Sequence, residues 1–313
     1  MIQLGFWPGG DRDGNPFVTA EITQKVAAEL HFSILKSYYE HLKNVRRRLS
    51  FRGVSEILEK LSHHLYDAIF KEDQSIHSDE ILKYLNEAKK IIVEKHNGLF
   101  LHLLEDFEDR VKIFGTHFAT LDIRQDSRVH QGIIDDILTK KSGLEIEKIS
   151  EEEKLNWLLN TDLVLDPNDF EGITKDTLEN INNIKNIQKR NGERGMSRYI
   201  ISNSDHIKEV LNVFALFKLC GYQEEEINID IVPLFETMEG LDAGENVMKE
   251  LYNFPIYRRH VERRGNEQTI MLGFSDGTKD GGYLKANWEI YETKEQLTKV
   301  SEDYGIKVIF FDG

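Results

Sequence analysis

The segment TIMLGFSDGTKDGG, at residues 269–282, carries the strongest indication of fold and chemistry in this chain. It opens with an apolar run typical of a buried strand and ends in a loop with four glycines, which let the backbone approach a ligand closely. The loop also holds two carboxylates and an ammonium group, on Asp276, Asp280 and Lys279. Charges at the end of a buried strand favour a catalytic strand end. The plainer alternative is a solvated charged turn between a strand and a helix.

Four more strand-like runs accompany this one, so that the set comprises residues 117–124, 198–202, 229–236, 269–276 and 306–312. Each run ends in a polar or charged residue, and each of the first four leads toward a helical stretch. Near-continuous apolar strands separated by helices indicate a parallel sheet that is buried on both faces. The last four runs recur about every 35 to 40 residues, as in the β/α units of a large barrel. We therefore predict a mostly helical α/β fold with a partial (β/α)8 TIM-type barrel.

The first third of the chain is predicted to be helical. Apolar residues recur at three- and four-residue steps over 22–49, which predicts a long amphipathic helix with Thr19 as its N-cap. Further helices are expected in three places: at about 54–70, from after Ser78 to a break near Asn97 and Gly98, and from 99 to about 113. The predicted domains are a helical region at 1–113 and a partial α/β barrel at 114–313, with a helical insertion at about 133–191.

The number of strands predicts an incomplete barrel. Five strands are too few to close an eight-stranded barrel, and no helix follows the last one, so we expect a piece of a longer polypeptide. Its open strand edges favour association, and we expect a contact between copies there or disorder in the loop at 277–282. Arg124, Glu236 and Asp276 should still face one another at one end of the sheet.

Composition limits the range of partners. The chain has 313 residues, of which 40% are apolar, and a formal net charge of −15. This charge argues against nucleic acid or an anionic membrane surface as the main partner. No signal-like segment opens the sequence and no apolar run is long enough to span a membrane, so we expect a soluble, cytoplasmic protein.

The ends of the predicted strands bring together residues suited to a metal and an anion. Glu236 and Asp276 come from different strands and could share one Mg²⁺, which prefers carboxylate oxygens, water and substrate oxygens. Arg124 offers a planar fork for a phosphate or a carboxylate. Such a site suits a reaction in which negative charge develops on oxygen, such as enolate formation or phosphoryl transfer. The alternative for Arg124 and Glu236 is a structural ion pair.

The segment GGDRDGNPFVT at residues 9–19 has the look of a calcium loop, but it does not fit one. Pro16 stands where that loop needs glycine, and Ile22 stands where it needs a bidentate glutamate. For Asp11, Arg12 and Asp13 we favour a rigid hydrogen-bonded turn that starts the long helix.

Several of these segments together resemble phosphoenolpyruvate carboxylase, over residues 6 to 313. FWPGGDRDGNPFVT and FGTHFATLDIRQDSRVH resemble two of the family's segments, and RYIIS resembles one of its barrel strands. VPLFETMEGL at 232–241 and IMLGFSDGTKDGG at 270–282 resemble its two most diagnostic blocks. The resemblance implies an enzyme that carboxylates phosphoenolpyruvate with bicarbonate to give oxaloacetate and phosphate, with Mg²⁺ or Mn²⁺ as cofactor and a homo-oligomeric state at full length.

The resemblance also implies roles for individual residues. Glu236 and Asp276 correspond to the metal ligands, Arg124 to an arginine near the substrate phosphate, and Lys279 to the lysine of the signature loop. The apolar walls beside the enolate would be formed by Trp7, Leu234 and Met271.

Some positions depart from the family's pattern. Phe274, Gly277 and Pro8 replace a tyrosine, a serine and a methionine, and Asp312 stands where many members carry histidine. The family's catalytic histidine lies in a His-Pro motif, and this sequence has no His-Pro. We therefore predict that the isolated chain is inactive. Two alternatives stay open: another Mg²⁺-dependent barrel enzyme acting on a phosphorylated or keto-acid substrate, and a non-catalytic helical scaffold.

Overall fold

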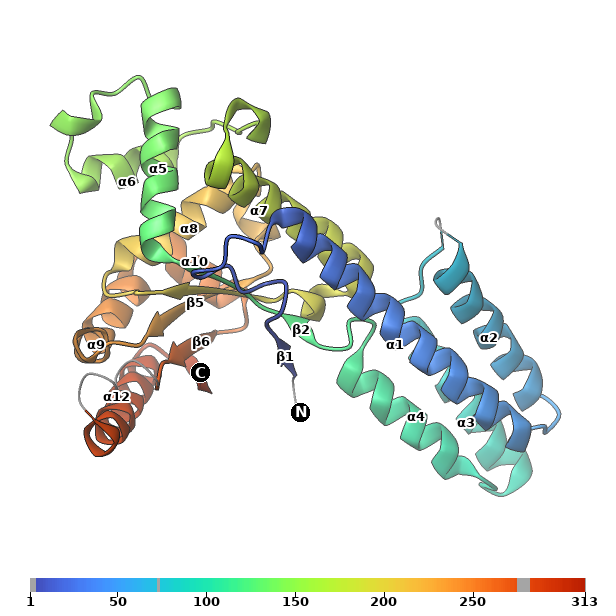
Figure 1. Cartoon of the computed structure of the whole chain (residues 1–313). Coiled ribbons are helices and arrows are strands. Elements are labelled where there is room, and N and C mark those ends of the chain that lie inside the picture. The colour runs from blue at the N-terminus through green and yellow to red at the C-terminus, as the bar shows by residue number, and fades with distance from the viewer. Residues whose placement is uncertain (1–3, 72–73, 275–281, 313) are drawn as a thin grey trace. The chain divides into compact units, whose positions relative to one another are not determined.

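The computed structural model describes residues 4–71, 74–274 and 282–312 (Figure 1). The chain forms two compact units, neither of which is continuous in sequence. Unit 1 comprises Met1–Pro8, Glu21–Leu121 and Asn183–Met196, and unit 2 comprises Gly9–Ala20, Asp122–Asn182 and Ser197–Gly313. The division into domains at residue 113 that the sequence suggested stays a prediction.

Unit 1 is built on four helices that lie side by side (Figure 1). They are α1 (Ala20–Arg48, its first residue in unit 2), α2 (Val54–Phe70), α3 (Ser78–His96) and α4 (Leu101–Phe114). Their periodic apolar residues form one buried cluster, which contains Leu42, Leu61 and Phe107. The predicted break after α3 is confirmed, because Asn97 and Gly98 both take positive φ angles, of 50° and 71°.

The strand predicted at 117–124 is wrong in its extent, because the run is divided at Asp122. Its first part forms β2 (Thr120–Leu121), which pairs in parallel with β1 (Gly5–Phe6) in unit 1. Its second part forms β3 (Ile123–Asp126), which pairs with a different partner in unit 2. The pattern of apolar side chains in the run does not reveal this division, because each part pairs with a strand that is distant in sequence.

Unit 2 contains a five-stranded parallel sheet whose strands follow one another in chain order. The strands are β3, β4 (Arg198–Ser202), β5 (Asp230–Phe235), β6 (Glu267–Leu272) and β7 (Lys307–Asp312). The predicted parallel sheet is thereby confirmed. Residues 10–12 run beside β3, where the Arg124 N–H donates to the Gly10 carbonyl at 3.0 Å and the Arg12 N–H donates to the Arg124 carbonyl at 2.8 Å.

The helices of unit 2 contact one face of this sheet. They are α5 (Ser127–Lys141), α8 (Ile207–Leu219), α9 (Met238–Asn253), α10 (Pro255–Arg263) and α12 (Tyr283–Asp303). Tyr199 on β4 contacts His130 of α5 and Phe217 of α8, and Phe310 on β7 lies near Lys294 of α12. The connections between the strands therefore place their helices on the same face of the sheet, and not on both faces.

The opposite face of the sheet is concave. The Arg198 guanidinium on β4 lies 4.7 Å from the centroid of the Phe311 ring on β7, although β5 and β6 lie between these strands. In a flat sheet, strands three places apart would be separated by about 14 Å. The contact shows that the sheet curls toward this face. Among the described residues β7 does not pair back with β3, so the sheet is not a closed barrel.

The remaining helices come between β3 and β4 in the sequence, except for one short 3-10 helix between α8 and β5. They are α6 (Glu151–Asn160), α7 (Gly172–Asn191) and the short 3-10 helices η1 (Ile146–Lys148), η2 (Pro167–Asp169), η3 (Glu193–Gly195) and η4 (Glu224–Glu226). Helix α7 begins in unit 2 and ends in unit 1. No helix within the described ranges has the length and apolar character that crossing a bilayer requires.

Candidate functional site

A polar cluster lies at the carboxyl ends of β3, β4 and β5 in unit 2. Asn203, just after β4, connects the other two strand ends. Its backbone N–H donates to Oε1 of Glu236 at 3.1 Å, and its side-chain amide donates to Oδ2 of Asp126 at 3.1 Å. Asn203 has a φ of 53°, a left-handed conformation that asparagine tolerates better than most residues. Asn203 therefore holds two carboxylates, from the strands on either side of β4, at fixed positions.

Glu236 follows β5 directly and is half-buried. The end of β6 lies so close to it that a Cβ on Gly273 would be 2.5 Å from the Glu236 Cβ. Only glycine fits at this position without displacing the glutamate. Two residues before these positions, Leu234 and Met271 are register partners in the β5–β6 pair, and both are buried. The glutamate thus projects from the same strand face as a pair of apolar side chains.

Arg124 lies on β3 and forms a two-point ion pair with Asp11. Its Nε donates to Oδ1 at 2.8 Å and its Nη2 donates to Oδ2 at 2.9 Å. Asp13 Oδ2 lies 4.0 Å from the same Nε. The planar fork predicted for an external anion is thus engaged by Asp11 in this structure, as in the ion-pair alternative, and the guanidinium is fixed in orientation.

The charges of the cluster influence one another. Burial opposes the charged form of Arg124, but its hydrogen bonds to Asp11, together with the charges of Asp13 and Glu236, raise its pKa. Asp126 is N-cap of α5, and burial disfavours its charged form. Hydrogen bonds from Arg128 nevertheless lower the pKa of Asp126. The Asp126 carboxylate therefore stays ionised near neutral pH.

The structure brings together some of the predicted site residues. Arg124, Leu234, Glu236 and Met271 lie in unit 2, at or near strand ends, and Asp312 is the last residue of β7. Trp7 lies in unit 1, directly after β1, and is half-buried. Asp276, Lys279 and the loop at 277–281 lie outside the described residues, so what the sequence predicts for them stays a prediction. Within the described ranges, no group of three or more His, Cys, Asp or Glu side chains is arranged to hold a metal ion.

The turn at 9–19 has the role favoured from the sequence. The Asp13 N–H donates to Oδ1 of Asp11 at 3.3 Å. Arg12 is buried in an ion pair with Asp176, and the same carboxylate accepts the Ala20 N–H at 2.9 Å, at the start of α1. The turn is therefore held at both ends, and it fixes Asp11 next to Arg124.

Sequence reasoning missed Asp126 and Arg128 as members of the cluster and Asp11 as the partner of Arg124. The signal for Asp126 was present, because an aspartate that ends a strand and precedes a helix is a typical N-cap. The pairing of Asp11 with Arg124 spans 113 positions and leaves no local signal.

Comparison with known proteins shows which family the chain resembles. A family model described as phosphoenolpyruvate carboxylase matches residues 1–78 and 67–313. The chain belongs to the phosphoenolpyruvate carboxylase family. The resemblance noted from the sequence motifs is thereby confirmed.

Curated relatives named phosphoenolpyruvate carboxylase align with the whole chain. The relative from Nitrosomonas europaea is 30% identical, that from Nitrosomonas eutropha 29% and that from Gloeobacter violaceus 27%. This chain covers 39% of the length of the two Nitrosomonas carboxylases and 40% of the Gloeobacter carboxylase. It therefore corresponds to about two fifths of the carboxylases that it matches.

Proposed function

We propose that this chain contributes metal- and substrate-binding residues to an enzyme that carboxylates phosphoenolpyruvate with bicarbonate, giving oxaloacetate and phosphate. The observation that carries the proposal is the match of the carboxylase family model across the chain. In the reaction of this family, bicarbonate attacks the phosphate to give carboxyphosphate and the enolate of pyruvate. Carboxyphosphate then releases CO2, which the enolate captures.

Glu236 and Asp276 would hold Mg²⁺ or Mn²⁺. The donor chemistry of Glu236 fits, since it presents a half-buried carboxylate at a strand end with one oxygen oriented by the Asn203 N–H. When bound, the metal supplies positive charge where negative charge develops on substrate oxygen. Glu236 also lies within electrostatic range of Arg124 and Arg128.

Arg124 would bind the phosphate of the substrate and would act in catalysis together with Lys279 of the signature loop. Asp11 acts as the positioning partner of Arg124, because its two hydrogen bonds fix the plane of the guanidinium before substrate arrives. Leu234 and Met271, with Trp7, would exclude water from the enolate, which would otherwise take up a proton. The burial of Leu234 and Met271 beside the Glu236 position supports this assignment.

We also propose that the sheet of unit 2 is part of a (β/α)8 barrel that further chain segments complete. Three features support this proposal: the consecutive parallel order of the strands, the helices on one face and the curl toward the other. A cytoplasmic location and a homo-oligomeric state at full length stay proposals that rest on the family.

The test compares this chain with a version extended to the length of its relatives. Oxaloacetate formation is measured with phosphoenolpyruvate, bicarbonate and Mg²⁺, using a coupled dehydrogenase. We expect turnover from the extended protein and none from the 313-residue chain, because catalytic groups that act as a unit lose most of their activity when one is missing. An inactive extended protein would exclude the proposed reaction. Robust turnover by the chain alone would refute the predicted inactivity.

A further inference from the structure

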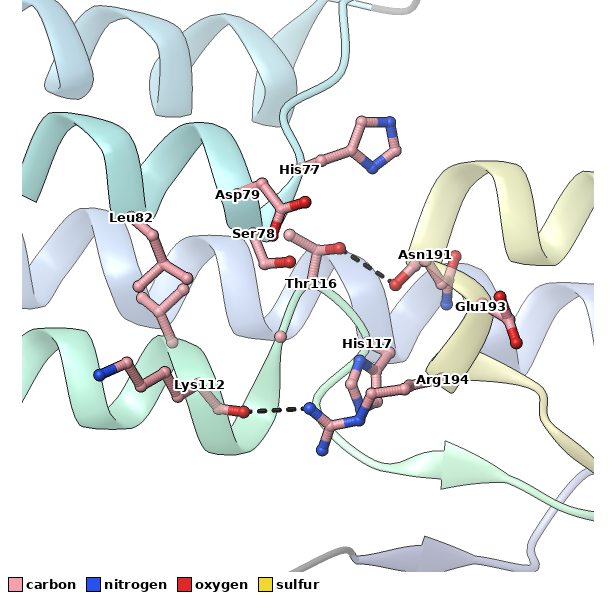
Figure 2. Close-up of a pocket in the computed structure, with 13 residues that line it drawn as sticks. His77, Ser78, Asp79, Leu82, Lys112, Thr116, His117, Asn191, Glu193 and Arg194 are labelled. Atoms are coloured by element: carbon pink, nitrogen blue, oxygen red, sulfur yellow. Dashed lines mark hydrogen bonds between the residues drawn. The ribbon is translucent and has the colours of Figure 1, made fainter. Parts of the chain in front are cut away.

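A cleft of about 470 Å³ is lined entirely by residues of unit 1, whereas the candidate site at the strand ends belongs to unit 2. It forms where α3 begins, where α4 ends and where α7 passes into η3 (Figure 2). Its volume is in the range of pockets that hold small organic ligands. None of the residues assigned to the carboxylase reaction lines this cleft.

His117 is the most informative residue of the cleft. It is only 4% exposed, and neither of its ring nitrogens hydrogen-bonds to any described residue. Gly115 makes room for the ring, since a Cβ at that position would lie 2.6 Å from Nδ1 of His117. Figure 2 shows the ring in the cleft beside Arg194. A buried imidazole without a partner is costly unless a ligand or water satisfies it.

Positive charge is fixed next to this histidine. The Arg194 guanidinium donates to the carbonyls of Lys112 and Ile113, at 3.0 and 3.2 Å, and is thereby held at the end of α4 (Figure 2). Its Nε is buried without a hydrogen-bond partner among the described residues. The N-terminus of α3 also lines the cleft, and the side chain of its N-cap residue His77 makes no capping hydrogen bond. The first N–H groups of that helix add further positive potential.

We propose that this cleft binds a small organic molecule through one oxyanion group, a carboxylate or a phosphate, with His117 as a hydrogen-bond donor and Arg194 as the charge partner. Leu82 and Val111 would contact the apolar body of the ligand. Asp79 and Glu193 also line the cleft, and their negative charges limit how much anionic charge it accepts.

The geometry couples binding to proton uptake. Burial, with a contribution from the Arg194 charge, lowers the pKa of His117 to about 4, so the ring is neutral near pH 7. An anion bound against the ring favours its protonated form, and affinity should therefore rise as the pH falls. The other titratable or charged groups around His117 are His77 and Asp79 at α3, Lys112 on α4, Glu193 and Arg194 on η3, and His31 on α1, which contacts the Thr116 carbonyl.

The test titrates the chain with sulfate and, separately, with propionate by isothermal calorimetry. Sulfate keeps its charge over the working range, so a rise in affinity between about pH 8 and about pH 6 reports a group on the protein. Saturation by sulfate alone would assign a phosphate-type ligand, and saturation by propionate alone a carboxylate. Absence of saturable binding by both probes would overturn the proposal.

Three variants separate a binding role from a structural one. His117→Gln should weaken binding about tenfold and abolish its pH dependence, whereas His102→Gln on the exposed face of α4 should change neither. Asp79→Asn should tighten binding about threefold, since it removes a like charge, and a folding defect would not produce this gain. Equal affinity in the parent chain, His117→Gln and Asp79→Asn would contradict the proposal.

Discussion

Gly273 shows how one residue fixes the geometry of the candidate site. It carries no side chain because the backbone of β6 ends against Glu236, with a hypothetical Cβ 2.5 Å from the Glu236 Cβ and 3.0 Å from its Cα. Neither contact can be relieved by rotating a flexible side-chain end. The first glycine of the GFSDG motif is therefore required for packing next to the proposed metal ligand, quite apart from any contact with a ligand.

Gly273→Ala should destabilise the fold by about 1–3 kcal/mol, because the added methyl group forces β5 and β6 apart. The free energy of unfolding from urea titration measures the effect. Gly132→Ala is the matched control: this glycine lies inside α5 with no atom within 4 Å of its hypothetical Cβ. The control should stabilise the chain by about 1 kcal/mol. Equal effects of the two substitutions would contradict the close approach at Gly273.

His130 makes stability depend on pH. It is fully buried under β4, with Nε2 2.9 Å from the Tyr199 hydroxyl, and burial lowers its pKa to about 3. The unfolded chain therefore binds a proton at this residue below about pH 6.5, where the folded chain does not. Stability contributed by the neutral ring is present above that pH and is lost as the pH falls toward the folded pKa.

His130→Gln should reduce this loss of stability by about 1.4 kcal/mol per pH unit between about pH 6 and about pH 4. Urea titrations at several pH values measure the slope for the parent chain and the variant. His260 is buried with its pKa also lowered to about 3, so a residual slope is expected in the variant. An unchanged slope would show that His130 does not stay neutral in the folded chain.

At the scale of elements, a buried ion pair connects the beginning of β3 to β4. Arg198 Nε donates to Oδ1 of Asp122 at 2.7 Å, and the guanidinium also lies over Phe311 of β7. Asp122 is 1% exposed and Arg198 is 9% exposed. These contacts hold the concave face of the sheet, and loss of one partner leaves the other as an uncompensated buried charge.

Asp122→Asn and Arg198→Met should each destabilise the chain by about 3–5 kcal/mol, and the double variant should cost clearly less than their sum. The exposed pair between Lys307 and Glu267, at 2.6 Å, connects β6 to β7 and serves as control. Lys307→Met should cost less than about 1 kcal/mol. Additive effects of Asp122→Asn and Arg198→Met would mean that the two charges do not stabilise each other.

The elements that sequence predicted well are those defined by local periodicity. Helices α2 and α3 closely match their predicted extents because their apolar residues repeat at helical spacing, and Asn97 ends α3. His206 is the N-cap residue of α8, and its backbone N–H donates to the Glu209 carboxylate. The division of the first strand run was not predicted, since strand partners are chosen by tertiary contacts.

The candidate site was predictable only in part. Arg124 and Glu236 were found because charged residues at strand ends are informative in a parallel α/β fold. The bridging role of Asn203 depends on its positive φ, and the pairing of Arg124 with Asp11 depends on a turn that runs beside β3. Neither is encoded in the spacing of residues along the chain.

At the scale of the whole molecule, the chain is a member of the carboxylase family that covers about two fifths of its relatives. Its five parallel strands place Arg124 on β3 and Glu236 at the end of β5, the two strands that flank β4 in one sheet, and the signature loop follows β6 in sequence. The scaffold alternative predicts that the carboxylates at these strand ends are structural. The carboxylase proposal predicts that they set the metal requirement of the full-length enzyme.

The Mg²⁺ dependence of oxaloacetate formation distinguishes these two accounts. In the protein extended to the length of its relatives, Glu236→Gln and Asp276→Asn should each raise the half-saturating Mg²⁺ concentration about tenfold or more, since each removes charge from a hard-cation site. Glu239→Gln, on the exposed first turn of α9, should leave it unchanged. Thermal unfolding should show that all three variants fold. An unchanged half-saturating concentration in both Glu236→Gln and Asp276→Asn would show that these are structural acids and would contradict the proposed metal site.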